Sequence, residues 1–160
     1  MKLSTKGRYG LRAVLDLAIN SKEEVVPLSE IAMRQNISIS YLEQLISKLR
    51  KAGIVTSVRG AQGGYKLAKD PEILSVGEIL RVLEGSLDPV NCAEITGEGE
   101  ACAGSDNCVT KLVWIRISDS INNAVDTLML SELLYENDKI NGQIDIDEDY
   151  IMDEFPHCGK

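Results

Sequence analysis

The order of two hydrophobic periods within residues 38–67 restricts the fold of this chain more than any other sequence feature. Apolar residues at helical spacing first predict a helix with one buried stripe. The stripe consists of Leu42, Leu45, Ile46 and Leu49. Gly53 is placed to end this helix as a C-cap, and residues 54–58 after it are rich in β-branched side chains. A glycine-rich turn over 59–64 and a second short strand at 65–67 complete a predicted β-hairpin.

The segment before this helix predicts the rest of a helix-turn-helix. Apolar residues at helical spacing indicate a first helix over about residues 6–20 and a shorter second helix over 28–35. A tight turn at Asn36 leads into the third helix, which we expect to begin near Ser38 or Ser40. Two short helices joined by a tight turn and followed by a hairpin form a winged helix-turn-helix. The predicted fold class is therefore mainly α with a small β-hairpin wing.

The remaining sequence predicts two more helical regions with a loop between them. Helical spacing resumes over residues 75–84, which closes a predicted winged-helix DNA-binding domain at 1–84. Residues 85–107 contain several glycines and no apolar period, so we expect a loop there. A helical region follows at 108–135. Residues 136–160 are expected to form an acidic tail that is mobile or loosely docked.

The helical region at 108–135 carries an apolar seam whose members are spaced alternately by three and four residues. They are Trp114, Ile117, Ile121, Ala124 and Leu128. Such a seam usually packs against a second helix, and one winged helix offers little surface for a helix of this length. We therefore favour a homodimer joined by this long dimerisation helix, although the same stripe could pack within one subunit. A two-fold homodimer would bind an inverted-repeat operator.

The charge of the chain is distributed unevenly. The formal net charge is −8, but residues 1–70 carry +6 and residues 71–160 carry −14. Nucleic-acid binding depends on the local basic surface rather than on the total, so double-stranded DNA is the expected partner. The first apolar stretch is broken by charges and lacks a cleavage pattern, and no apolar run is long enough to cross a bilayer. We expect a cytoplasmic protein without a membrane partner.

The polar face of the third helix and the tip of the wing contain the predicted DNA-binding residues. Gln44 can pair with adenine in the major groove, and Glu43 can accept from cytosine N4. Alternatively, Glu43 forms a capping box with Ser40. Arg59, followed by Gly60, suits a narrow minor groove, although it could also be a solvated turn residue. The other predicted DNA-binding residues, several of them expected at phosphates, are Lys6, Arg8, Ser38, Tyr41, Lys48, Arg50 and Lys51.

Three of the four cysteines lie close together in the sequence. Cys92, Cys102 and Cys108 fall within 17 residues, and in a reducing compartment such cysteines are more often metal ligands or redox thiols than structural disulfides. Thiolates bind iron-sulfur clusters and zinc, and they also form redox switches. We favour an iron-sulfur cluster, with zinc and a thiol switch as alternatives. For Cys158 beside His157, an unstructured terminal pair is favoured over a metal contact.

The sequence gives little support to an enzyme. The single histidine is His157, close to the end of the chain. We find no phosphate-binding loop, no nucleophile elbow and no pair of carboxylates that would form a catalytic site.

Four segments together resemble the Rrf-type family of bacterial transcription regulators, and most closely its members with an iron-sulfur cluster. They are KGRYGLRAVLDLA in the first helix, SISYLEQLISKLRKAGIV in the third, VRGAQGGYKLAKD in the wing, and the three-cysteine loop. The resemblance covers roughly residues 1–135. It implies a homodimer whose long helix, here residues 107–130, crosses its partner. It also implies a cluster on the loop cysteines, 2Fe–2S favoured over 4Fe–4S, and control of genes for cluster assembly, sulfur or redox metabolism.

This chain departs from the cysteine pattern of those relatives. They have five residues between successive cysteines and a histidine three positions after the last, whereas nine residues here separate Cys92 from Cys102. The histidine position is Lys111, whose ammonium has no lone pair for a metal. The fourth ligand is left open among Glu94, Asp106, Cys158 and an exogenous thiol. The rival hypothesis is a winged-helix repressor governed by zinc, thiol redox state or a partner protein.

Overall fold

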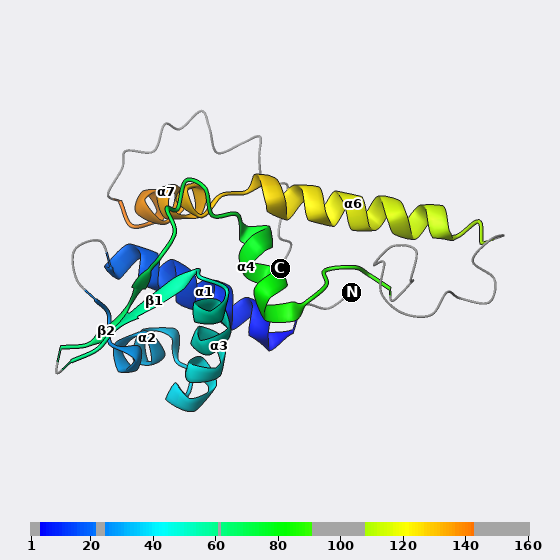
Figure 1. The fold of residues 1–160 in the computed structure, drawn as a ribbon. Coiled ribbons are helices and arrows are strands. Elements are labelled where there is room, and N and C mark those ends of the chain that lie inside the picture. The colour runs from blue at the N-terminus through cyan, green and yellow to red at the C-terminus, as the bar shows by residue number, and fades with distance from the viewer. Residues whose placement is uncertain (1–3, 22–24, 61, 91–107, 143–160) are drawn as a thin grey trace.

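The computed structural model describes residues 4–21, 25–60, 62–90 and 108–142 (Figure 1). Within these ranges the chain forms six α-helices and one two-stranded antiparallel sheet. Three helices precede the sheet and three follow it. The predicted fold class, mainly helical with a β-hairpin wing, is confirmed.

The first three helices form the helix-turn-helix unit. α1 spans Thr5–Asn20 and begins after Ser4, whose side chain accepts a hydrogen bond from the amide of Lys6 at 3.0 Å. α2 spans Leu28–Gln35 and ends at Asn36, which adopts the left-handed conformation with φ of 53°. This reversal directs the chain into α3, Ile39–Lys51.

The wing is an antiparallel hairpin of β1, Val55–Val58, and β2, Gly64–Leu67. The segment before α2 is joined to this hairpin, because Val26 and Tyr65 of β2 exchange two backbone hydrogen bonds of 2.8 and 2.9 Å. A Cβ atom on Gly64 would lie 2.6 Å from the carbonyl oxygen of Val26, so this close approach requires glycine. The base of the wing is therefore held to the segment that leads into α2.

The main core lies where α1, α2, α3 and α4 (Val76–Glu84) meet. The predicted stripe on α3 is fully buried there. The largest buried side chains are Val14, Leu17, Ile31, Leu42, Leu45, Ile46, Leu49, Ile54, Leu74, Ile79, Leu83 and Leu130. Each contributes about 1.5–3 kcal/mol as an upper estimate, so this cluster holds the helix-turn-helix together. Leu130 belongs to α7, which ties the C-terminal part of the chain to the same core.

The C-terminal part contains two helices where we expected one helical region. α6, Lys111–Thr127, projects beyond the rest of the molecule, and α7, Leu130–Ile140, continues from its C-terminal end across the body of the molecule, where it contacts α1 (Figure 1). Leu128 and Met129, between the two helices, are extended. Their backbone is held by two hydrogen bonds of 2.9 Å, from the amide of Val76 to the carbonyl of Leu128 and from the amide of Leu130 to the carbonyl of Leu74. α7 thus continues past the expected start of the tail at residue 136. No helix in the described ranges is long and apolar enough to span a membrane.

Candidate nucleic-acid interface and cysteine site

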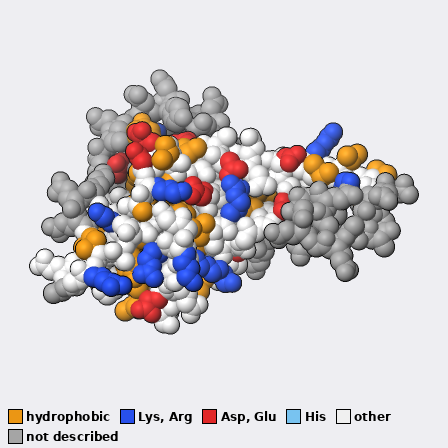
Figure 2. All heavy atoms as spheres, in the orientation of Figure 1, with side chains coloured by type: hydrophobic (Ala, Val, Ile, Leu, Met, Phe, Trp, Pro, Cys, Tyr) orange, Lys and Arg blue, Asp and Glu red, His pale blue; other side chains and the backbone are white. Residues whose placement is uncertain are grey.

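The outer face of α3 is polar and open to solvent because its apolar stripe faces the core. Ser40, Glu43 and Gln44 are exposed along the first two turns. The basic residues Lys48, Arg50 and Lys51 lie in the last turn. Figure 2 shows Lys and Arg side chains gathered across the lower part of the molecule, where Figure 1 places α2 and α3. This face has the polarity and charge expected of a surface that meets the DNA major groove.

The N-terminus of α3 is capped by Ser38. Its hydroxyl accepts a hydrogen bond from the amide of Tyr41 at 3.3 Å. The capping box considered for Ser40 and Glu43 is therefore not the cap of this helix, because Ser40 already lies inside it. The Ser38 hydroxyl is engaged within the chain, whereas the Glu43 carboxylate is free of that role.

Tyr41 is committed to contacts with α1. Its hydroxyl donates to Thr5 Oγ1 at 3.2 Å, and its ring meets Tyr9 edge to face with centroids 6.1 Å apart. The guanidinium groups of Arg8 and Arg12 lie 6.0 and 5.6 Å from the centroid of Tyr9. Tyr41 thus fixes α1 against α3, and it brings the exposed Arg8 to the same side of the molecule as α3.

Lys48 also makes an intramolecular contact that the sequence did not indicate. Its ammonium donates to the carbonyl of Leu83, in the last turn of α4, at 3.2 Å. The next residue, Glu84, accepts hydrogen bonds at one oxygen from the amides of Ser4 and Gly7, at 3.0 and 2.8 Å. The end of α4 therefore holds both α3 and the start of α1. No local pattern could have identified this junction, since Glu84 and its partners lie about 80 residues apart.

A second missed feature is the buried carboxylate of Asp16 on α1. Asp16 is only 4% exposed, and it accepts from Arg34 at 2.7 and 3.0 Å and from Gln35 at 2.7 Å. The hydrogen bonds from Arg34 to Asp16, with a weaker contribution from Glu30, raise the pKa of the Arg34 guanidinium. The carboxylate thus anchors the end of α2 to α1. The only signal in the sequence is an acidic residue among the apolar positions of a helix.

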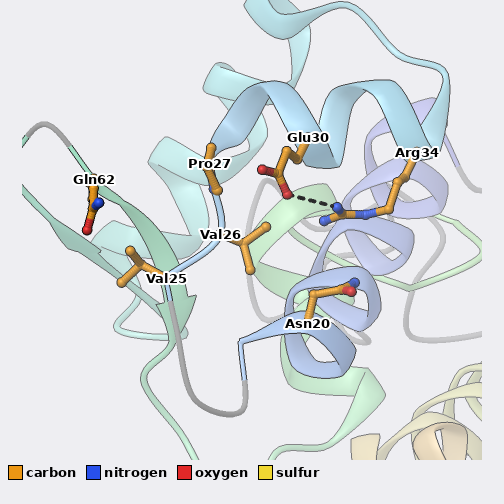
Figure 3. A pocket seen from close by; sticks show the side chains of 8 residues that line it. Asn20, Val25, Val26, Pro27, Glu30, Arg34 and Gln62 are labelled. Atoms are coloured by element: carbon orange, nitrogen blue, oxygen red, sulfur yellow. Dashed lines mark hydrogen bonds and ion pairs between the residues drawn. The ribbon is translucent and has the colours of Figure 1, made fainter.

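Beside this network is an open pocket of about 760 Å³, shown in Figure 3. It lies between the end of α1, the start of α2 and the wing, and Arg34 bonds to Glu30 at 3.2 Å in its wall. Because Arg34 is already paired with Asp16 and Glu30, the pocket has no unpaired cation from this side chain. We assign it no ligand.

Arg59 and Gly60 are exposed at the tip of the wing. Gly60 has φ of +133°, a conformation that favours glycine, and its carbonyl accepts from the amide of Gly63 at 3.0 Å. The turn thus holds Arg59 away from the core. Its contact with a minor groove remains a prediction.

Cys108 is the one predicted cluster ligand within the described residues. Its thiol is exposed, lies 3.2 Å from the hydroxyl of Thr110, and sits just before α6. Hydrogen bonds from that hydroxyl and from the amide of Lys111 lower the pKa of the thiol, which favours the thiolate that binds iron or zinc. Cys92 and Cys102 lie outside the described residues. So do three proposed fourth ligands, Glu94, Asp106 and Cys158. The described ranges contain no group of three side chains that could hold a metal ion.

The predicted dimer seam on α6 is divided by the structure. Ile121 and Leu128 pack against a second apolar cluster of the same chain, formed by Val76, Leu80 and Leu87. By contrast, Trp114, Ile117 and Ala124 are exposed on the same helix. Three neighbouring apolar residues share that exposure: Val109, Leu112 and Val113.

Three features together define a winged-helix transcription regulator: the hairpin that follows α3, the basic outer face of α3, and the projecting helix α6. Residues 3–136 match the family model for Rrf2, described as an iron-dependent transcriptional regulator. The chain therefore belongs to the Rrf2 family of transcription regulators, and the resemblance seen in the sequence is confirmed. This is a family of regulators rather than of enzymes.

Relatives with assigned names agree with this placement. The chain is 43% identical over 149 residues to the HTH-type transcriptional regulator IscR of Vibrio campbellii, covering 92% of this chain and 86% of the relative. It is 46% identical over 134 residues to IscR of Escherichia coli O1:K1, covering 84% and 80%.

Solved structures of the same family share the fold. The structure of T. potens IscR is 42% identical, with a TM-score of 0.71 over 94% of this chain and 96% of that one. The structure of CymR (YrzC), the global cysteine regulator of B. subtilis, is 41% identical, with a TM-score of 0.68 over 83% and 95%. The fold of this chain is therefore similar to that of two regulators with different names, IscR and CymR.

Proposed function

We propose that this chain is a homodimeric, cytoplasmic regulator that binds an inverted-repeat operator and responds to an iron-sulfur cluster held by Cys92, Cys102 and Cys108. The observation that carries the sensing part is the exposed thiol of Cys108, whose pKa is lowered, at the start of α6. It supports the proposal because thiolates are the protein ligands of such clusters, and the family is described as iron-dependent. A 2Fe–2S cluster is favoured over a 4Fe–4S cluster.

The DNA contacts proposed for each subunit are assigned to side chains that are exposed to solvent. Ser40, Glu43 and Gln44 would face base edges in the major groove. Arg59 and Gly60 would enter the minor groove. The phosphate contacts would come from Lys6, Arg8, Arg50 and Lys51, whose side chains are exposed. Ser38, Tyr41 and Lys48 would act mainly by holding α3 in place, because each already has a partner within the chain.

The proposed dimer joins two copies through the exposed part of α6. Apolar side chains such as Ile117, which is 38% exposed, gain from burial against a second helix. The proposed organisation is a DNA-binding domain at 1–84, a cluster loop at 85–107, a dimerisation region at 108–135 and an acidic tail at 136–160. α7 extends the helical part to Ile140.

Side-chain contacts run from α6, which begins three residues after Cys108, through α4 to the proposed DNA-binding face. α6 is tied to α4 because Arg81 pairs with Asp126 and donates to Asn122 at 2.9 Å. α4 in turn contacts α3 through Lys48 and Leu83. Cys92, Cys102 and Cys108 would hold the cluster, which would supply a rigid, redox-active group there and would favour one arrangement of the segment that carries these ligands. DNA affinity can change only by the difference in cluster affinity between two arrangements of the protein.

The alternative is a winged-helix repressor governed by zinc, thiol redox state or a partner protein. The observation that favours it is the same exposed thiol, since a thiolate also binds zinc and is readily oxidised. The choice between cofactors therefore rests on what the purified protein contains.

The deciding experiment is anaerobic purification with iron and acid-labile sulfide measured per chain. We expect visible absorbance in the wild-type protein and its loss in Cys102→Ala and Cys108→Ala. Cys158→Ala serves as the matched control and should keep most of the iron. Operator affinity is then measured before and after reconstitution. Colourless, iron-free protein would exclude the cluster, an operator affinity unchanged by reconstitution would exclude its regulatory role, and zinc at one ion per chain would support the alternative.

A further inference from the structure

Two large apolar side chains are exposed at the turn of the helix-turn-helix. Met33, near the end of α2, is 75% exposed, and Ile39, the first residue of α3, is 48% exposed. Both line a shallow hollow of about 570 Å³. Ala32 and Ile37 contribute further apolar surface to it. Ser29, Asn36 and Ser38 complete its lining, so the hollow joins polar and apolar surface. The two exposed apolar side chains need an explanation, because they face solvent beside the proposed DNA surface.

The backbone around the hollow is held by hydrogen bonds. The left-handed turn at Asn36 places its amide 3.2 Å from the carbonyl of Met33, and the amide of Ile37 bonds to Ala32 at 3.0 Å. Ser38 caps the next helix through its bond to the amide of Tyr41. Ile39 is therefore presented on a preformed backbone.

Core packing does not explain the position of Ile39. The buried stripe of α3 begins one turn later at Leu42, which is fully buried. Ile39 lies at the edge of that stripe and keeps about half of its surface in solvent. Within the first turn of α3, Ser38 and Tyr41 are engaged within the chain, so Ile39 and Ser40 are the side chains left to meet a partner.

The neighbours of Ile39 indicate which partner it meets. Ser40 is adjacent, and Glu43 lies four residues on, which places it on the same side of the helix. Both are proposed to face base edges, so Ile39 would lie in the same groove. In the major groove, the C5-methyl of thymine is the apolar group on a base edge. The carboxylate of Glu43 disfavours a phosphate at this position, since like charges repel.

We propose that Ile39 reads the C5-methyl of one thymine in each operator half-site, with Met33 closing the far wall of the hollow. The inference rests on the proposed function, in which α3 enters the major groove. It adds a sequence-reading residue that recognises a base by apolar contact alone.

The test removes the methyl group from the DNA and the apolar side chain from the protein. An operator is first selected from random duplex DNA with the full-length protein, and each thymine is then replaced singly by deoxyuridine. We expect the wild-type protein to lose about fourfold in affinity per half-site at one thymine position, the effect of burying a single methyl group. Ile39→Ala should bind the thymine and deoxyuridine operators equally.

The controls separate the outcomes. Ile73→Ala removes another isoleucine, 73% exposed and outside the helix-turn-helix, and should keep the wild-type response. If Ile39→Ala unfolds, Ile39→Val provides a smaller change with an intermediate response. A wild-type protein that binds its operator but ignores every deoxyuridine substitution, or an Ile39→Ala protein that keeps the response, would refute the inference. If Gln44→Ala also left operator binding unchanged, the proposed placement of α3 itself would be wrong.

Discussion

At the scale of single residues, Asp16 is the clearest case of a polar group on which packing depends. Its carboxylate is buried between α1 and α2, and its donors among the described residues are the Arg34 guanidinium and the side-chain amides of Asn20 and Gln35. Gln35 is in turn held by Arg12, whose Nε donates to it at 2.9 Å. Loss of the carboxylate would leave these donors without their acceptor, and such groups are costly to leave unpaired.

We expect Asp16→Ala to lower the free energy of unfolding by about 2 kcal/mol, measured by urea denaturation. This is less than the roughly 3–5 kcal/mol for a fully buried pair, because a third of the Arg34 side chain is exposed to water. Glu30→Ala is the matched control, since its ion pair with Arg34 is largely exposed and should cost no more than about 0.5 kcal/mol. Equal losses in the two variants would show that Asp16 has no special role.

At the scale of elements, α6 is the one helix in the described part of the chain that has no fully buried apolar residue. Its buried residue is Ser118, whose hydroxyl donates to Asp88. The apolar groups nearer its start are open to solvent, whereas Ile121 and Leu128 toward its end pack on their own subunit. A helix that is anchored at one end and apolar along its free part fits a dimer contact better than an isolated monomer.

We expect Ile117→Asp to convert a dimer into a monomer, measured by light scattering at micromolar concentration. A charge placed in an apolar helix contact must be desolvated without a partner, which opposes association. Asn123→Asp adds the same charge at an exposed position of α6 outside the seam, and it should remain dimeric. A wild-type protein that is already monomeric would contradict the proposed dimer.

At the scale of the whole molecule, α4 connects the helix-turn-helix to α6. One side of it pairs with α6 through Arg81, and its end holds α3 through the carbonyl of Leu83 and α1 through Glu84. Gly10 lets α1 lie directly against α4, because a Cβ atom there would overlap Leu83. Within the described residues, α4 therefore links the basic face to α6 directly, and Leu130 of α7 provides a second link through the core.

The basic face also predicts the salt dependence of DNA binding. Each phosphate contact releases a counterion, so Lys51→Gln should reduce the slope of log affinity against log salt by about one unit, with little change in sequence preference. Lys69→Gln is the control, since Lys69 pairs with Glu78 away from α3 and should leave the slope unchanged. Titrations of labelled operator at several salt concentrations give both slopes. An unchanged slope for Lys51→Gln would remove this residue from the interface.

Local periodicity predicted α1, α2, α3, α4 and the wing from the sequence alone. This was feasible because helices and hairpins satisfy their backbone groups with near neighbours, and because turn residues such as Asn36 and Gly53 act locally. The exposed α3 residues that are proposed to read bases could also be predicted, since they are the positions left over by the buried stripe. The exposure of Ile39 was not predicted, because an apolar residue at a helix start is usually taken for a core residue.

The sequence by itself determined which segments are helical, which face of α3 is buried, and where the charge changes sign, because these depend on side chains a few positions apart. Tertiary structure alone decided the break between α6 and α7. Helical spacing runs through it, and only pairing with residues 74 and 76 opens the helix. It also decided the partners of Asp16, Lys48 and Glu84, since contacts between residues 18 to 80 positions apart leave no periodic trace in the chain.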